Sequence, residues 1–197
     1  MKLRRSCGIL GGTFDPIHIG HLHAAEQIRQ TLNLDIIYFV PNRSPVHKPE
    51  GAIASAEDRF QMVSLAVQSN PHFVTSRVEL DRLGPSYAID TIEEFAQSIE
   101  PNTQIHFVVG TDSLPTLSLW HRYSDLLDCG VLVAVTRPGA TDTTAFKYGD
   151  RGVRYVEISP VDISSTSVRD EIKNGRSARY LAPDCVLDYI KSKNLYR

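Results

Sequence analysis

Short apolar runs alternate with helical patterns along this 197-residue chain, and this alternation limits the possible folds more than any other feature of the sequence. Six apolar runs contain predicted strands, at residues 7–10, 35–40, 72–80, 104–109, 130–136 and 155–158. Helices are predicted at residues 22–32, 55–69 and 89–99 and in a polar stretch that ends at Leu127. Strands that alternate with helices predict an α/β protein whose parallel sheet is covered on both faces.

The C-terminal part, residues 164–197, has the pattern of two further helices. Gly175 ends the first of them, and Pro183 at an early helical position starts the second. Three apolar residues of the second helix are expected to pack on the body of the protein: Val186, Tyr189 and Ile190. Neither a repeat nor a low-complexity tract interrupts the chain, so residues 1–197 are predicted to form a single domain with a doubly wound, Rossmann-like sheet.

Size and composition exclude several classes of protein. A chain of this length buries roughly 70% of its unfolded surface without disulfide or metal support. A formal net charge of −2 is ordinary, so neither disorder nor a general nucleic-acid surface is expected. The three cysteines, Cys7, Cys129 and Cys185, form no disulfide framework and indicate a reducing compartment, and the first two are expected to be buried. No run resembles a signal peptide or membrane span, which favours the cytoplasm, and a homo-oligomer is left open.

Residues 11–21, Gly-Gly-Thr-Phe-Asp-Pro-Ile-His-Ile-Gly-His, join the first predicted strand to the first predicted helix. The two adjacent glycines permit unusual backbone conformations and a close approach to a ligand. His18 and His21 are three residues apart and share a helix face, and a helix N-terminus favours phosphate. The stretch therefore predicts a polyphosphate site. A simple tight turn with ordinary boundary histidines is an equal alternative, and a zinc site that includes His23 is disfavoured because no HExxH pattern is present.

Residues 163–169, Ile-Ser-Ser-Thr-Ser-Val-Arg, have a similar character at the other end of the chain. Hydroxyl side chains normally cap helices, and Ser167 with Asp170 matches a capping box. Capping explains only one hydroxyl, whereas consecutive hydroxyls followed by Arg169 also suit a second phosphate site. In a doubly wound sheet ligands bind beyond the carboxyl ends of the strands. The polar segments that follow the predicted strands are therefore expected to line one crevice.

Together the two motifs resemble the HxGH-type and ISSTxxR signatures of the nucleotidyltransferase superfamily. Within it, the chain resembles bacterial nicotinate-mononucleotide adenylyltransferases along nearly its whole length. Three further segments support this resemblance: the proline-rich loop 41–48, residues 76–87, and residues 109–112 followed by Trp120. Two positions depart from the family pattern. Val46 replaces the second proline of Pro-Pro-His-Lys, and Ala88 replaces a threonine near the nicotinate end of the pocket.

The resemblance implies that a mononucleotide 5′-phosphate attacks the α-phosphorus of ATP, forming nicotinate adenine dinucleotide and pyrophosphate for NAD biosynthesis. It assigns catalysis to His18, His21, Lys48 and Arg169. It assigns ATP binding to Gly11, Gly12, Thr13, Phe14, His18, His21, Asp112, Arg137, Ser164, Ser165, Thr166 and Arg169. It assigns mononucleotide binding to Asn42, His47, Lys48, Tyr87, Ala88 and Trp120. Mg²⁺ is expected on the ATP phosphates and water, with no dedicated protein metal site.

Alternatives remain at this point. By residue type alone, Lys48 could be a solvated loop residue, Asp112 a helix cap and Trp120 part of the core. A sister enzyme could use nicotinamide mononucleotide or phosphopantetheine as the acceptor, and the loss of threonine at Ala88 leaves the choice between acid and amide open. A non-catalytic nucleotide sensor is less favoured, because both phosphate motifs are intact.

Overall fold

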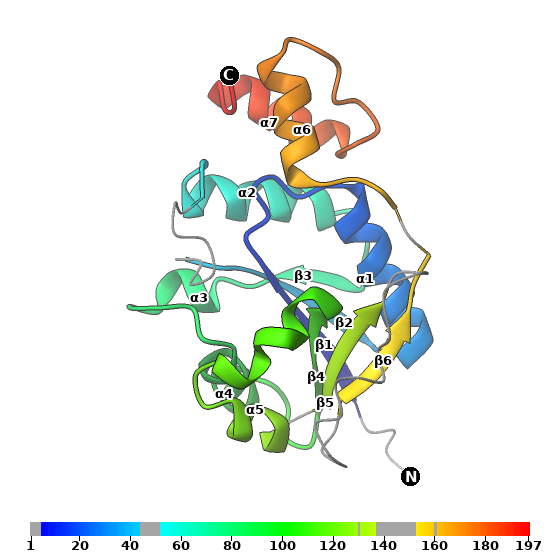
Figure 1. The fold of residues 1–197 in the computed structure, drawn as a ribbon, viewed down its shortest axis with the longest axis vertical. Coiled ribbons are helices and arrows are strands. Elements are labelled where there is room, and N and C mark those ends of the chain that lie inside the picture. The colour runs from blue at the N-terminus through cyan, green and yellow to red at the C-terminus, as the bar shows by residue number, and fades with distance from the viewer. Residues whose placement is uncertain (1–4, 44–51, 130, 137–152, 160) are drawn as a thin grey trace.

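A computed structural model describes residues 5–43, 52–129, 131–136, 153–159 and 161–197. It contains a six-stranded, fully parallel sheet in the order β3-β2-β1-β4-β5-β6 (Figure 1). The strands are β1 (Ser6–Gly12), β2 (Ile36–Pro41), β3 (Phe73–Thr75), β4 (Gln104–Gly110), β5 (Val131–Thr136) and β6 (Val153–Glu157). This is the order of doubly wound, Rossmann-like sheets, with the switch point between β1 and β4. The predicted fold class is confirmed.

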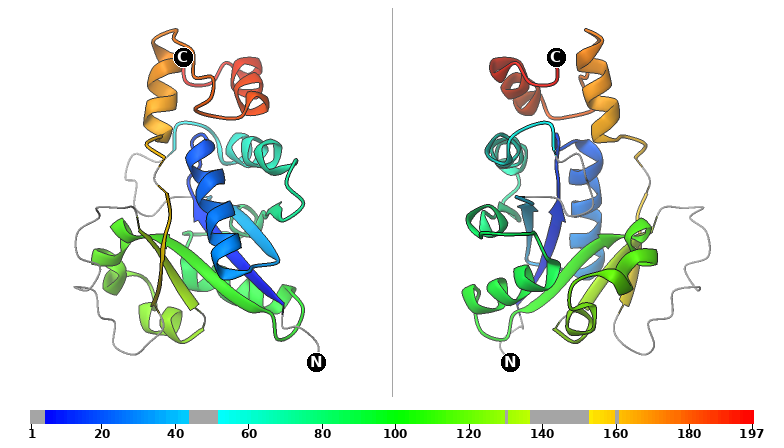
Figure 2. Two further views of the ribbon diagram at one scale, coloured as in Figure 1. Left: turned by 90° about the vertical axis from the view of Figure 1, so that its right-hand side faces the viewer. Right: turned by 60° about the vertical axis from the view of Figure 1, so that its left-hand side comes forward.

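Helices cover both faces of the sheet, as Figure 2 shows. The first, second and last helices contribute buried residues to one face: α1 (Ile19–Leu32), α2 (Ala56–Val67) and α7 (Asp184–Lys193). The other face is covered by α4 (Ala88–Ser98), the 3₁₀ segment η1 (Thr111–Leu119) and α5 (Tyr123–Cys129). The remaining helices are α3 (Val78–Asp81) and α6 (Ser165–Lys173). None of the described helices is both long and apolar enough to span a bilayer.

The central strands divide their side chains between the two faces. On β4, Phe107 packs with α4 and η1, whereas the next residue, Val108, packs with the opposite core. Successive side chains of a strand point to opposite faces, so a strand covered on both sides is apolar at nearly every position. The continuous apolar runs in the sequence follow from this arrangement.

The strand predicted within residues 72–80 is shorter than expected. Only Phe73–Thr75 pairs with β2, and Val78–Asp81 forms α3 instead. The alternation at Val74, Ser76 and Val78 is therefore misleading beyond its first residues. β3 is an edge strand, which is commonly short. Val78 packs against the core on the α4 side of the sheet as part of a helix, not of a strand.

The two C-terminal helices lie where the sequence predicts them. Gly175 has φ 69° just after α6, and Pro183 is the N-cap of α7. Val186 and Ile190 are buried in the core, and Tyr189 is partly buried beside it. Among the cysteines, Cys7 is buried, and burial raises the pKa of its thiol to about 11. Cys129 is exposed at the last position of α5, so the expectation of burial there is wrong.

Candidate functional site

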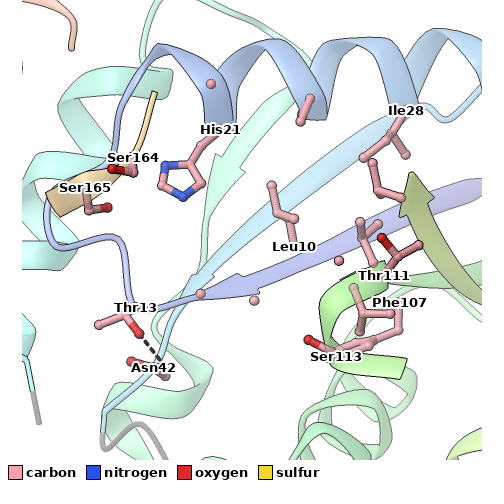
Figure 3. Close-up of a pocket in the computed structure, with 18 of the residues that line it drawn as sticks. Leu10, Thr13, His21, Ile28, Asn42, Phe107, Thr111, Ser113, Ser164 and Ser165 are labelled. Carbon is pink, nitrogen blue, oxygen red and sulfur yellow. Dashed lines mark hydrogen bonds between the residues drawn. The ribbon is translucent and has the colours of Figure 1, made fainter. Parts of the chain in front are cut away.

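A cavity of about 1070 Å³ opens at the carboxyl ends of β1 and β4, where the strand order switches. Residues from both motifs and from the middle of the chain surround it (Figure 3). The predicted site residues that line it are Gly11, Gly12, Thr13, His18, His21, Asn42, Tyr87, Ala88, Trp120, Ser164, Ser165, Thr166 and Arg169. The structure thus brings the described parts of the predicted polar segments together in one crevice.

The two histidines of the first motif lie at the start of α1. His18 is the N-cap and is buried, and His21 occupies the first helical turn. Their rings stack with centroids 3.7 Å apart, and the His18 backbone N–H donates to Nδ1 of His21 at 3.2 Å. A nitrogen that accepts a hydrogen bond carries no proton, so the neutral His21 ring bears its proton on Nε2. The ring therefore offers an N–H donor suited to a phosphate oxygen.

The unusual backbone conformation of the motif falls on Phe14, whose φ is 48°, and not on the glycine pair. Gly11 and Gly12 belong to β1, so the expectation of an unusual conformation there is wrong. Gly12 is needed for packing, since a Cβ would lie 2.9 Å from the Phe14 ring. Phe14 is buried beneath the site. Its ring contacts the His21 ring edge-on, with the ring centroids 5.0 Å apart. Phe14 therefore supports the histidine ring from behind.

A buried arginine joins the first motif to the segment after β2. Arg59 on α2 is only 1% exposed. Its Nη1 donates to the Thr13 carbonyl at 2.7 Å and its Nη2 to the Asn42 carbonyl at 2.7 Å. Nη1 also contacts Oδ1 of Asn42 at 3.2 Å, which turns the Asn42 amide toward Thr13 (Figure 3). The sequence analysis missed Arg59, because an arginine in a helical pattern normally indicates an exposed face.

The second motif forms the start of α6 and contacts the first motif directly. The Ser165 hydroxyl donates to the Pro16 carbonyl at 2.9 Å, and Nη1 of Arg169 donates to the Asp15 carbonyl at 2.7 Å. Nη2 of Arg169 donates to the Thr166 hydroxyl oxygen at 3.2 Å, which leaves the Thr166 proton available to a ligand. Figure 3 shows His21, Ser164 and Ser165 facing the same opening.

Helix capping at this end differs in detail from the prediction. The N-cap is Ser164, whose Oγ accepts from the Ser167 N–H at 3.0 Å. The Ser167 hydroxyl completes the capping box with Ser164, so the predicted box of Ser167 with Asp170 is wrong. Ser164 is thus used for capping and Ser165 for contact with the first motif. Thr166 and Arg169 remain the side chains of this motif best placed to donate to an anion.

The opposite end of the cavity is formed by the start of α4 and the end of η1. Tyr87 is the N-cap of α4, Ala88 is its first residue, and Trp120 directly follows η1. The Tyr87 ring stacks on His121 with centroids 4.4 Å apart. This aromatic surface is suited to a flat ring, and the N-terminus of α4 is suited to a carboxylate. His121, to which the sequence analysis gave no role, lines the cavity through this stacking.

A buried carboxylate organises the same end. Glu79 is 6% exposed and accepts from the Thr91 hydroxyl at 2.7 Å. Burial raises the pKa of Glu79, and hydrogen bonds from Thr91 and Ser86 partly oppose this shift. Ser86 in turn accepts from the Arg43 N–H at 3.2 Å. Glu79 therefore connects the wall near α4 with the residues that follow β2.

Several predicted residues cannot be placed. His47, Lys48 and Arg137 lie outside the described residues. The backbone of Asp112 lies in η1, but its side chain is also outside the described part. In the part of the chain that the structure describes, no three His, Cys, Asp or Glu side chains gather as metal ligands would. His23 instead pairs with Gln27 on the same helix, at 3.0 Å.

The sequence matches the family described as Cytidylyltransferase-like over residues 9–171. It is 40% identical to a protein of Oceanobacillus iheyensis named "Probable nicotinate-nucleotide adenylyltransferase", with 98% of this chain and 97% of that protein covered. It is 39% identical to a protein of the same name from Saccharopolyspora erythraea, with 100% of this chain and 92% of that protein covered. The matches therefore cover both motifs and the region between them.

The fold is similar to that of solved structures. The nicotinic acid mononucleotide adenylyltransferase of Plasmodium falciparum complexed with NaAD superposes with a TM-score of 0.78 at 18% identity. The same enzyme complexed with APC gives a TM-score of 0.76 at 17% identity. Each alignment covers 98% of this chain and 97% of the other. At this level of identity the similarity establishes the fold.

Proposed function

The chain belongs to the cytidylyltransferase-like family and, within it, to the nicotinate-nucleotide adenylyltransferases, and we propose that it joins ATP to nicotinate mononucleotide. The products are nicotinate adenine dinucleotide and pyrophosphate, a step of NAD biosynthesis. The observation that carries this proposal is the single cavity in which the starts of α1, α4 and α6 meet. Each helix N-terminus presents the positive end of its dipole to an anionic group.

The reaction proceeds by in-line displacement at phosphorus. A 5′-phosphate oxygen of the mononucleotide forms a bond to the α-phosphorus of ATP, and the bond from that phosphorus to the bridging oxygen of pyrophosphate breaks. The electron pair of the broken bond leaves with pyrophosphate. No protein nucleophile takes part, so the chain positions the reactants and stabilises the negative charge that spreads over the phosphates.

The residues at the start of α1 and α6 serve the triphosphate in this proposal. The His21 Nε2–H donates to a phosphate oxygen, and His18 stacks against the ring and fixes its orientation. Thr166 and Arg169 bind the β- and γ-phosphates from the other wall. The resemblance assigns charge neutralisation to Lys48, which follows β2, together with Arg169, and assigns ATP binding to Arg137, which follows β5.

The start of α4 and the aromatic residues serve the acceptor. Trp120 contacts the pyridine ring, and the Tyr87–His121 stack forms the adjoining wall. The pyridine carboxylate binds the free N–H groups at the start of α4, where Ala88 offers no side-chain hydroxyl. A carboxylate gains more than an amide from a positive helix end, which favours the acid as the acceptor.

Mg²⁺ is the metal that fits this site best. Bound here, the ion would take its ligands mainly from phosphate oxygens and water, as Mg²⁺ usually does. It would supply charge neutralisation on the transferring and leaving groups. Addition of EDTA is expected to abolish turnover, and excess Mg²⁺ to restore it.

The test compares acceptors in one assay. Purified protein, ATP and Mg²⁺ are mixed with nicotinate mononucleotide, nicotinamide mononucleotide or phosphopantetheine, and pyrophosphate release is measured. The proposal predicts the highest kcat/KM with nicotinate mononucleotide. A higher value with either other acceptor would identify a sister enzyme, and ATP binding without turnover would identify a sensor.

A further inference from the structure

The carboxylate of Asp15 is buried beneath the first motif and receives three hydrogen bonds. The backbone N–H groups of Ile53 and Ala54 donate to it at 2.8 and 3.1 Å. The third donor is the hydroxyl of Tyr196, the penultimate residue of the chain, at 2.6 Å. Asp15 is 3% exposed and Tyr196 is 9% exposed. A buried carboxylate is costly unless it is fully hydrogen-bonded, so these donors determine where Asp15 lies.

The backbone around Asp15 is held from the opposite side by α6. Its carbonyl accepts from Arg169, and the carbonyl of the next residue, Pro16, accepts from Ser165. His18 follows only two residues later, at the start of α1. Asp15 thus lies at the point where Tyr196, the 53–54 segment and α6 all contact the first motif.

The conformation of Tyr196 indicates that this contact is specific. Its φ is 63°, in the left-handed region that bulky residues rarely adopt and that persists only where the surroundings enforce it. Burial and the hydrogen bond to Asp15 raise the pKa of Tyr196, so the phenol stays neutral and keeps its proton for donation. The buried guanidinium of Arg59 supplies a nearby positive charge for the carboxylate.

From this arrangement we infer that Tyr196 is a positioning residue for adenylyl transfer: through Asp15 it fixes the turn that carries His18 and His21. The inference rests on the proposed function for its kinetic consequence but not for its structural one. Tyr196 does not line the cavity, so its effect is transmitted through Asp15 and not by contact with a substrate.

Tyr189 offers a matched control on the same C-terminal segment. Its hydroxyl donates to Asp58 on α2 at 2.9 Å, so it also joins a C-terminal tyrosine to a carboxylate of the body. Asp58 is outside the first motif. Tyr196→Phe and Tyr189→Phe each lose one hydroxyl and keep the ring, and Tyr196→Phe is expected to lower Tm more, because Asp15 is buried whereas Asp58 is partly exposed.

The kinetic test distinguishes a contact that only stabilises the fold from one that also positions the catalytic histidines. Tyr196→Phe is expected to lower kcat roughly tenfold with little change in KM, because displaced catalytic groups cost rate at the transition state. Tyr189→Phe is expected to keep the wild-type kcat. In an Asp15→Ala background, which removes the acceptor, adding Tyr196→Phe should lower kcat no further, since coupled residues are not additive. Wild-type kcat in Tyr196→Phe, or an independent further loss in the double variant, would overturn the inference.

A spectroscopic test does not depend on turnover. The imidazole nitrogen and proton resonances of His18 and His21 report ring tautomer and orientation. Tyr196→Phe is expected to shift these resonances, and Tyr189→Phe is expected to leave them at the wild-type positions. Unchanged resonances in Tyr196→Phe would refute the positioning role, whereas an inactive wild-type enzyme would count only against the proposed function.

Discussion

At the level of single residues, one hydrogen bond determines what the histidine pair can do. The His18 N–H occupies Nδ1 of His21, so Nε2 carries the proton in the neutral ring. His18 itself is buried and stacked, which restricts its ring to one orientation. Gly20 permits this arrangement, because a Cβ there would lie only 3.0 Å from the His18 ring. The pair is therefore preorganised before any nucleotide binds.

Replacement of His18 by alanine is expected to lower kcat by roughly 10²–10³-fold, because His21, the transition-state donor, loses the ring that holds it in place. The loss has two physical sources, removal of the His18 ring and release of the stacked His21 ring. Steady-state pyrophosphate release measures it, and circular dichroism should show a retained fold. His72→Ala is the control. His72 is exposed, and its ring contacts the backbone carbonyl of Asp35, which lies outside both motifs. Wild-type turnover in His18→Ala would contradict the assigned role.

Glu79 gives a prediction about pH. Burial raises its pKa above the ordinary value of 4.5, so protonation of Glu79 is more favourable in the folded protein than in the unfolded chain. Its stabilising contribution is complete below pH 4.5 and is lost as the pH rises through the folded-state pKa. Urea unfolding at pH 5 and pH 8 should therefore show Glu79→Gln gaining stability relative to wild type at the higher pH. A difference that is constant with pH would contradict this account.

At the level of elements, the starts of three helices determine the chemistry of the cavity. α1 presents the histidine pair, α6 presents Thr166 and Arg169, and α4 presents Tyr87 and Ala88. The starts of α1 and α6 face each other. The hydrogen bond from Ser165 of α6 to the Pro16 carbonyl joins α6 to the turn that precedes α1. The third begins at the acceptor end. In the proposed reaction this arrangement separates the triphosphate of ATP from the carboxylate of the acceptor.

The role of α4 can be tested by deleting one N–H group. Ala88→Pro removes that donor, and proline is well tolerated at the first position of a helix. The preceding residue, Tyr87, has φ −88° and ψ 134°, which suits a residue before proline. We expect KM for nicotinate mononucleotide to rise about tenfold, the loss of one charge-assisted bond, with KM for ATP unchanged. Ala88→Thr keeps the N–H and should bind the acceptor normally.

Most elements could be predicted from the sequence because their patterns are continuous. β1, β2 and β4 are apolar on both faces, and Gly175 and Pro183 mark helix boundaries by their backbone preferences. The prediction of a strand up to Leu80 was wrong, because period-two alternation cannot distinguish a short edge strand from the helix that follows it. Tertiary packing decided that case.

At the level of the whole molecule, the C-terminal helices are part of the main core. Val186, Ile190 and Tyr196 pack with residues of α1 and α2 on one face of the sheet. Figure 1 shows α6 and α7 together at the end of the molecule next to α2. The two signature motifs, at opposite ends of the sequence, therefore meet because this segment returns to the start of α1.

Ile190→Ala tests how closely this segment is integrated. Ile190 is 3% exposed, and truncation of a buried isoleucine costs about 2–5 kcal/mol of unfolding free energy. We expect the free energy of unfolding measured with urea to fall by that amount while the transition stays single. A separate early transition for the C-terminal segment would show that it unfolds independently of the sheet.

The connections between distant segments are what the sequence could not predict. Nothing in the local pattern indicates that Arg59 would be buried beneath Thr13 and Asn42, or that Tyr196 would reach Asp15. His121 likewise has no motif, and only its stacking on Tyr87 places it at the cavity. Motifs predict the residues that face a ligand, whereas the residues that support them depend on the tertiary fold.

In the proposed reaction the mononucleotide attacks the α-phosphorus of ATP, and the products in which the phosphates end up reveal which phosphorus is attacked. The enzyme is supplied with nicotinate mononucleotide and ATP labelled at either the α- or the γ-phosphorus, and the products are separated. The account predicts the α-label in the dinucleotide and the γ-label in pyrophosphate. Transfer of the γ-label to the mononucleotide, or release of the α-label as free AMP without dinucleotide, would contradict it.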